Sequence, residues 1–249
     1  MEHQTMTRLG LSMINGYGGG EFIICHELSH MWWGDAVSLV DWHHMWLNEG
    51  FATYSEALWA EYQYGYSSMQ TYTHNSIRMP YISWENPANA YPLSNPPVNP
   101  TYLFSLLTYE KGGSVLHTLR YNLGDSVFFQ ALHDYYDTHR YEFVDTDDFQ
   151  SACEGAYGDT LDWFFDCWVH DIGYPMFEYY HYYTETNPGE YDITFGVMQM
   201  QETPYPLFST FAEVRLAVTG AWADTFRVFI DEPFEEYHFT YSGTEPTGM

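Results

Sequence analysis

The feature that most constrains this chain is a pair of helical runs, the first carrying two histidines and the second opening on a carboxylate. The first run contains His26-Glu27-Leu28-Ser29-His30, and Glu49 follows nineteen residues after His30. Residues four apart lie on one face of a helix, so His26 and His30 can bind one ion together. Glu27 projects about 100° away from His26, where it can touch a water on that ion without ligating the ion.

Two imidazoles form an incomplete site, because a catalytic zinc usually takes three protein ligands and keeps its fourth position for water. A helix–loop–helix return could bring the carboxylate of Glu49 back as the third ligand. The sequence therefore predicts a zinc hydrolase site with one Zn²⁺ per chain, held by His26, His30 and Glu49.

Three other residues near this pair of helices need an interpretation. His43 and His44 lie in the return, where a polar loop fits them better than a ligand set that is already complete. Glu56 lies seven residues after Glu49 and on the same helical face. It could orient a zinc-bound histidine or be an ordinary exposed helix glutamate, and the sequence leaves both interpretations open.

The motifs of this chain resemble those of the aminopeptidase N family of gluzincin zinc peptidases. The chain reads HELSHMWWGD around the first helix and NEGFATYSE around the second. Its segment Tyr109-Glu110-Lys111-Gly112 matches the family's Y-E-K-G block, and Met1-Glu2-His3 resembles the end of the family's G-x-M-E-N exopeptidase motif, with histidine in place of asparagine. The resemblance covers most of residues 1–172 and is looser in the C-terminal part.

This resemblance implies a zinc-dependent aminopeptidase that hydrolyses the N-terminal peptide bond of peptides. Glu27 would act as general base on the attacking water and then pass the proton to the leaving amine. Tyr109 would donate a hydrogen bond to the developing oxyanion. Glu2 would hold the free α-ammonium of the substrate by charge-assisted hydrogen bonds.

Three alternative functions use the same residues. A thermolysin-type endopeptidase would share the zinc triad, and an epoxide hydrolase on the same scaffold would keep all of these residues. A non-catalytic zinc-binding fragment is the third alternative, since a zinc helix pair can persist where the substrate-binding half is missing. The Y-E-K-G block and the Met1-Glu2 segment favour the aminopeptidase over the endopeptidase.

The hydrophobic pattern predicts an α+β chain in two parts. The helical period predicts a mostly helical part over residues 1–172. The resemblance implies that this part is a thermolysin-like catalytic domain, truncated at its N-terminus. Residues 1–11 should be extended, as an edge strand or its exit, and the proline-rich stretch 85–101 should be irregular. After Gly173 the hydrophobic period changes from 3.6 to 2, which predicts a small antiparallel β-sandwich over 173–249, from which a final strand could be missing.

In the family, an N-terminal β domain and part of the catalytic domain precede the motifs that open this sequence. The chain is therefore expected to be a fragment. Its first residues then do not indicate its compartment, and a periplasmic or secreted location stays open.

Charge limits the classes of partner. The chain has 249 residues with 7 basic and 34 acidic side chains, a formal net charge of −27. Such acidity argues against nucleic acid or an anionic membrane as a partner. A hydrophobic content of 45% argues against a disordered acidic tail. No stretch approaches the roughly twenty apolar residues of a membrane span. The expected partner is a peptide with a free N-terminus, and the oligomeric state is open.

Overall fold

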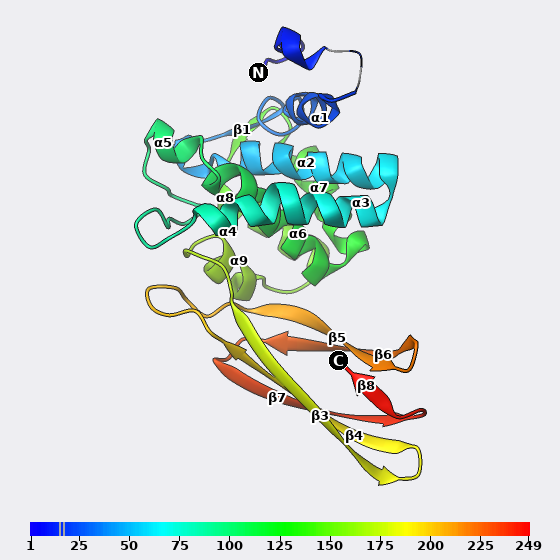
Figure 1. Cartoon of the computed structure of the whole chain (residues 1–249). Helices are drawn as coiled ribbons and strands as arrows, with labels where there is room; N and C mark the ends of the chain where they lie inside the picture. Colours follow the sequence, from blue (N-terminus) through cyan, green and yellow to red (C-terminus); the bar gives the residue numbers. More distant parts are fainter. Residues whose placement is uncertain (15, 17) are drawn as a thin grey trace. The chain divides into compact units, whose positions relative to one another are not determined.

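The computed structural model describes residues 1–14, 16 and 18–249, and it divides into two compact units, Met1–Gly173 and Tyr174–Met249 (Figure 1). Helices dominate the first unit and antiparallel strands build the second. The α+β class predicted from the sequence is confirmed. No helix in the described part of the chain is both long and apolar enough to cross a bilayer.

The first unit is a set of helices joined by short segments. Its α-helices are α1 (Glu21–Ser29), α2 (Trp46–Tyr64), α3 (Tyr66–Tyr72), α4 (Met79–Trp84), α5 (Pro100–Leu103), α6 (Gly112–Leu123), α7 (Asp125–His139), α8 (Thr146–Tyr157) and α9 (Asp162–Trp168). Two 3₁₀ turns, η1 (Leu11–Met13) and η2 (Trp42–His44), precede α1 and α2. Two π-helical segments are η3 (Thr73–Arg78) and η4 (Leu107–Lys111).

Helix α2 is the central element of this unit. It contacts α1, α3, η4 and α6, and its first half is buried from Trp46 to Tyr54. Phe51 packs against Phe149 of α8 with ring centroids 5.0 Å apart, and Phe149 packs against Tyr135 of α7 at 5.2 Å. This aromatic core holds the start of α2 in place, and the start of α2 is where Glu49 lies.

The N-terminal segment and the region after α2 differ from the sequence-based expectation. The edge strand expected over residues 1–11 is wrong, because residues 1–10 form no helix or strand and η1 follows them. A strand needs a hydrogen-bonded neighbour, and no described strand lies beside this segment. Helices α3 and α4 were not predicted from the sequence, although the buried residues of this stretch, Met69, Thr73, Ile77 and Tyr81, recur at a helical spacing. A short parallel pair, β1 (Val37–Leu39) with β2 (Glu142–Val144), was also missed.

The second unit is a sandwich of two three-stranded sheets. One sheet has the order β3-β4-β7, with bounds Phe177–Asn187, Glu190–Gln199 and Phe234–Ser242. The other has the order β6-β5-β8, with bounds Ala221–Ile230, Thr210–Val218 and Pro246–Gly248. All pairs are antiparallel, as predicted. The alternating apolar residues meet between the sheets, among them Ile193, Phe195, Val214 and Leu216.

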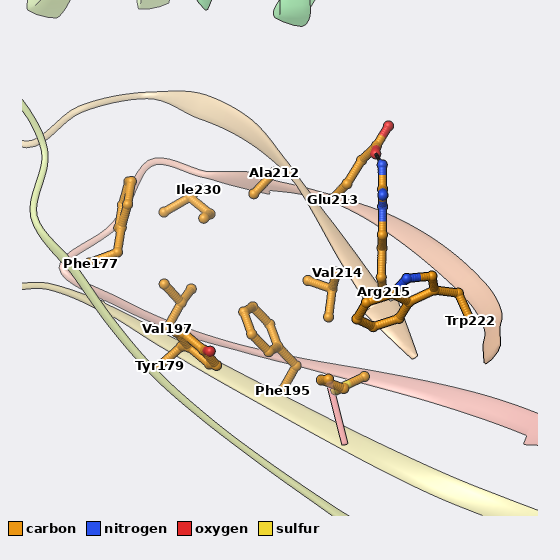
Figure 2. Close-up of a pocket in the computed structure, with 11 residues that line it drawn as sticks. Phe177, Tyr179, Phe195, Val197, Ala212, Glu213, Val214, Arg215, Trp222 and Ile230 are labelled. Carbon is orange, nitrogen blue, oxygen red and sulfur yellow. Dashed lines mark hydrogen bonds and ion pairs between the residues drawn. The ribbon is translucent and has the colours of Figure 1, made fainter. Parts of the chain in front are cut away.

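A groove of about 370 Å³ opens between the two sheets of this unit. Figure 2 shows apolar side chains from both sheets converging on it, among them Phe177, Val197, Val214 and Ile230. Among the described residues, β8 pairs with β5 only at Ala217 and Val218. No other described strand pairs with that edge of β5.

Candidate active site

Helices α1 and α2 place two histidines and a glutamate around one point. Oε2 of Glu49 lies 3.2 Å from Nε2 of His26 and 3.4 Å from Nε2 of His30. One ligand atom from each residue lies within 4.8 Å of the others. His30 and Glu49 are only 2% and 6% exposed, because the start of α2 is buried beneath α1. The three predicted ligands are thus brought together.

The spacing of these atoms fits a tetrahedral zinc ion. Two ligand atoms that each lie about 2.0–2.1 Å from zinc at a tetrahedral angle are roughly 3.4 Å apart. The two distances to the carboxylate oxygen of Glu49 agree with this value. Two imidazoles and one carboxylate are also a donor set of catalytic zinc sites, which keep a further position for water.

The second nitrogen of each imidazole is held by a hydrogen bond. Nδ1 of His26 lies 2.8 Å from Oε1 of Glu56, and Nδ1 of His30 lies 3.1 Å from the carbonyl oxygen of Trp33. Because both partners accept, each Nδ1 carries a proton and each Nε2 lone pair is left for the metal. Tyr72 donates its hydroxyl to the other oxygen of Glu56. Glu56 therefore orients His26, so of the two interpretations left open by the sequence, the exposed helix glutamate does not apply.

The charges of the site support one another. Burial disfavours the charge on Glu49, but hydrogen bonds from His26 and His30 outweigh it and lower the pKa of Glu49 to about 2. Burial likewise opposes the charge on His26, but Glu49 and Glu56 raise its pKa to about 9. The carboxylates of the site thus favour positive charge at the position between them.

Tyr109 lies directly beside the three ligands. It belongs to η4, and its ring is parallel to that of His26 with centroids 6.0 Å apart. Burial, together with the charge of Glu49, raises the pKa of Tyr109 well above its usual value. The hydroxyl therefore keeps its proton and remains a donor.

Two glycines bring α2 close to the point where η4 continues into α6. A Cβ atom at Gly112 would lie 2.8 Å from the Cα of Gly50, and one at Gly50 would lie 2.9 Å from the Cα of Gly112. Such contacts are shorter than packed carbon atoms allow. The glycines next to Glu49 and in Y-E-K-G thus permit backbone contact between the element of Glu49 and the element of Tyr109.

Glu2 and Glu27 are the two remaining site residues expected from the sequence. An oxygen of Glu2 accepts a hydrogen bond from Nδ2 of Asn48 at 3.2 Å and lies 3.9 Å from Nδ1 of His30. Gly34 leaves room for it, since a Cβ atom there would meet both Glu2 and Asn48 at 2.5 Å. The side chain of Glu27 is 15% exposed, and one of its oxygens lies 2.5 Å from the amino group of Met1.

The sequence of the chain matches a known family of peptidases. The profile of the Peptidase family M1 domain matches residues 19–168, which is more than half of the chain. The chain belongs to peptidase family M1. The resemblance to the aminopeptidase N family predicted from the sequence is therefore confirmed.

This family M1 chain has relatives in several kingdoms. Aminopeptidase M1 of Arabidopsis thaliana is 30% identical over 159 residues, covering 62% of this chain and 18% of that protein. Aminopeptidase N of Homo sapiens is 35% identical over 126 residues, covering 48% of this chain and 13% of that protein. The chain thus spans less than a fifth of the length of these two curated relatives.

Two solved structures are also similar to the M1 chain. Aminopeptidase A of Legionella pneumophila, solved with aspartic acid, matches with a TM-score of 0.74 over 98% of this chain and 26% of that one, at 19% identity. This likeness shows the fold alone. A mutant M1 zinc metallopeptidase of Deinococcus radiodurans, bound to a Tyr-Ser-Ala substrate, matches with a TM-score of 0.53 at 31% identity, over 63% of this chain and 34% of that one.

A cavity of about 490 Å³ borders the metal site of the M1 chain, and its walls were not predicted from the sequence. Glu2 and Glu49 lie on its polar side, and Trp42, Met45 and Phe104 are among its apolar walls. No motif marks those three side chains, which come from the return between the helices and from the end of α5. Sequence alone offers no signal for them beyond their apolar character.

The two histidines of the return take structural roles. His43 lies 2.9 Å from Oδ1 of Asp41, and His44 lies 3.0 Å from the hydroxyl of Thr146. Neither belongs to the metal-binding group found among the described residues. The polar-loop interpretation of both residues agrees with these contacts.

Proposed function

We propose that this chain is the metal-binding part of a zinc aminopeptidase that hydrolyses the N-terminal peptide bond of peptides. The observation that carries the proposal is the ring of Tyr109, which lies parallel to the ring of His26 at 6.0 Å, directly beside the ligand atoms of His26, His30 and Glu49. A hydrogen-bond donor next to a three-ligand metal site is the arrangement that stabilises an oxyanion. Met1–Gly173 would form the catalytic part and Tyr174–Met249 an accompanying β-sandwich domain.

Each side chain of the site has a distinct task in this proposal. Zinc, when bound to His26, His30 and Glu49, would lower the pKa of a water and polarise the substrate carbonyl. The carboxylate of Glu27 accepts the proton of the attacking water and passes it to the leaving amine. The hydroxyl of Tyr109, which keeps its proton, donates a hydrogen bond to the oxyanion as it forms.

Glu2 would make the enzyme an exopeptidase. Its carboxylate lies at the border between the metal site and the cavity of about 490 Å³. A carboxylate that holds the substrate's α-ammonium fixes how far the scissile bond lies from the metal, so one residue is removed at a time. The neighbouring cavity then accommodates an adjoining substrate side chain, and its apolar walls suit an apolar one.

The test is the dependence of turnover on a free amino group. The protein is assayed with an aminoacyl anilide and with the N-acetylated form of the same compound. We expect the parent to cleave the free form alone. Glu2→Ala should raise the KM for the free form, and the acetylated compound should remain uncleaved by the variant. Glu202→Ala, which removes an exposed loop carboxylate, is the matched control.

Two results would contradict the proposal in different ways. Equal cleavage of both forms by the parent would support a thermolysin-type endopeptidase. Full zinc occupancy without turnover of either form would support a non-catalytic zinc-binding fragment.

A further inference from the structure

A second polar cavity lies between the α3–η3 segment and α6, and it shares no lining residue with the metal site or with the cavity beside Glu2. Its volume is about 300 Å³. All seven lining side chains are polar: Gln70, Thr73, His74, Arg78, Ser114, His117 and Thr118. None of these seven is acidic, in a chain where 34 acidic residues face 7 basic ones. The surroundings of this cavity therefore differ in charge from the rest of the molecule.

The cation of this cavity is Arg78, and its charge is not balanced by a carboxylate. Arg120, Arg140 and Arg215 each form an ion pair with an Asp or Glu. Within the described part of the chain, no ion pair to a carboxylate is formed by Arg78. A guanidinium with several N–H donors and no acidic partner is suited to a ligand with acceptor oxygens.

Arg78 also fixes the proton position on His74. The guanidinium lies in hydrogen-bond contact with Nδ1 of His74. Because arginine can only donate, Nδ1 must be the acceptor, and the proton of the neutral ring is on Nε2. The remaining hydrogen-bonding group of His74 is therefore a donor.

A hydrogen bond with Tyr54 positions His117. The hydroxyl of Tyr54 lies 3.3 Å from Nδ1 of His117. With Nδ1 paired to this hydroxyl, Nε2 is the ring nitrogen left for a ligand, and it is a donor when the hydroxyl donates to Nδ1. Burial, with the nearby charge of Arg120, lowers the pKa of His117 to about 4, so the ring is neutral at pH 7.

Two further features point to a ligand. The hydroxyl oxygen of Ser114 is buried without a hydrogen-bond partner among the described residues, and such groups are rare unless something binds them. The cavity wall from Thr73 to Arg78 is π-helical, a conformation that is frequent at functional sites. A further π-helical segment among the described residues carries Tyr109.

We propose that this cavity binds a small oxyanion of the size of phosphate. Arg78 supplies the charge through its planar fork, which matches two oxygens of one group. His74, His117 and Ser114 supply neutral donors, and the chain around them supplies no competing carboxylate on the cavity wall. The site is separate from the metal centre and does not depend on the proposed peptidase activity.

Titration calorimetry with inorganic phosphate at constant ionic strength tests this site. We expect one phosphate per chain for the parent, and affinity at least about tenfold weaker for Arg78→Gln, as for the loss of a charge-assisted hydrogen bond. His74→Phe, a change at an exposed position, should also weaken binding. Arg140→Gln removes the same charge at an exposed arginine elsewhere and should bind as the parent does.

Phosphate could also bind a metal in the zinc site, so Glu49→Ala is titrated in parallel. Retained binding in Glu49→Ala with weakened binding in Arg78→Gln supports the proposal. Binding lost in Glu49→Ala and kept in both Arg78→Gln and His74→Phe would place the phosphate at the metal and overturn it. The absence of any binding by the parent at millimolar phosphate would overturn it as well.

Discussion

Oε1 of Glu56 lies 2.8 Å from Nδ1 of His26, so a carboxylate two turns along α2 from Glu49 orients a histidine of the metal site. One helix thus supplies both a ligand and the group that aligns another ligand. The hydroxyl of Tyr72 holds the second oxygen of Glu56 in turn. The affinity of the site for zinc should therefore depend on residues that do not touch the ion.

We predict that Glu56→Ala weakens zinc binding by about 10–100-fold, because His26 loses the partner that fixes its ring and proton. Competition with a chromophoric chelator measures this affinity. Glu202→Ala is the control and should bind zinc as tightly as the parent. Unchanged affinity in Glu56→Ala would show that His26 is oriented by other contacts.

Glu27→Gln should keep its zinc and lose turnover, because an amide cannot accept the proton of the attacking water. Elemental analysis and the anilide assay are made on the same preparation. A Glu27→Gln protein with near-parent kcat would exclude Glu27 as the general base. Loss of zinc in this variant would instead indicate a ligand role that the geometry does not give it.

Tyr109→Phe should lower kcat by about a hundredfold or more with little change in KM, since its hydrogen bond would form chiefly in the transition state. Tyr66→Phe is the matched control, because Tyr66 is 58% exposed on α3. Steady-state kinetics on both variants check the prediction. A rise in KM with unchanged kcat would argue for a substrate-binding role of Tyr109.

Gly112→Ala should destabilise the fold by about 1–3 kcal/mol or more, since the added Cβ would overlap the backbone of Gly50. Gly155→Ala in α8 is the opposite case, because no atom lies within 4 Å of its added Cβ. It should stabilise the protein by roughly 0.5–1 kcal/mol through helix propensity. Urea unfolding measures both changes. Equal effects of the two substitutions would mean that the glycine contact is not tight.

Glu110→Gln should stabilise the protein at pH 8 and not at pH 5. Burial is the main cause that raises the pKa of Glu110 from 4.5 to about 7, and Oε2 of this side chain has no hydrogen-bond partner among the described residues. Between these values the unfolded chain releases the proton and the folded chain keeps it, so stability falls as the pH rises. An amide does not ionise, so the Glu110→Gln variant should be more stable than the parent by about 1–3 kcal/mol above pH 7. Thermal unfolding of both proteins at several pH values checks this. A difference in Tm between variant and parent that is independent of pH would contradict the prediction.

The parts of the site that could be predicted are those with a local or motif-level signal. The i, i+4 spacing of His26 and His30 follows from helix geometry, and Glu49 follows from the need for a third ligand. Tyr109 is one of 24 tyrosines, and only the Y-E-K-G context distinguishes it. The β-sandwich was predictable because its strands alternate apolar and polar residues over their length.

The parts that could not be predicted depend on contacts between distant segments. Gly50 and Gly112 lie far apart in the chain, and a glycine in a sequence does not show which structural requirement it meets. The hydrogen bond between Tyr54 and His117 likewise has no signature in the sequence. Residues 1–10 failed as a strand because pairing, and not local preference, decides strand formation.

The backbone contact between Gly50 and Gly112 also bears on how this protein can change over evolution. Here the main chains themselves set the separation between a metal ligand and the neighbouring hydroxyl donor, so substitutions elsewhere leave that separation intact. The apolar walls of the adjoining cavity, at Trp42, Met45 and Phe104, have no such backbone constraint. Under the proposed function, substitutions at these walls would change selectivity for the substrate side chain without changing the spacing of the reacting groups.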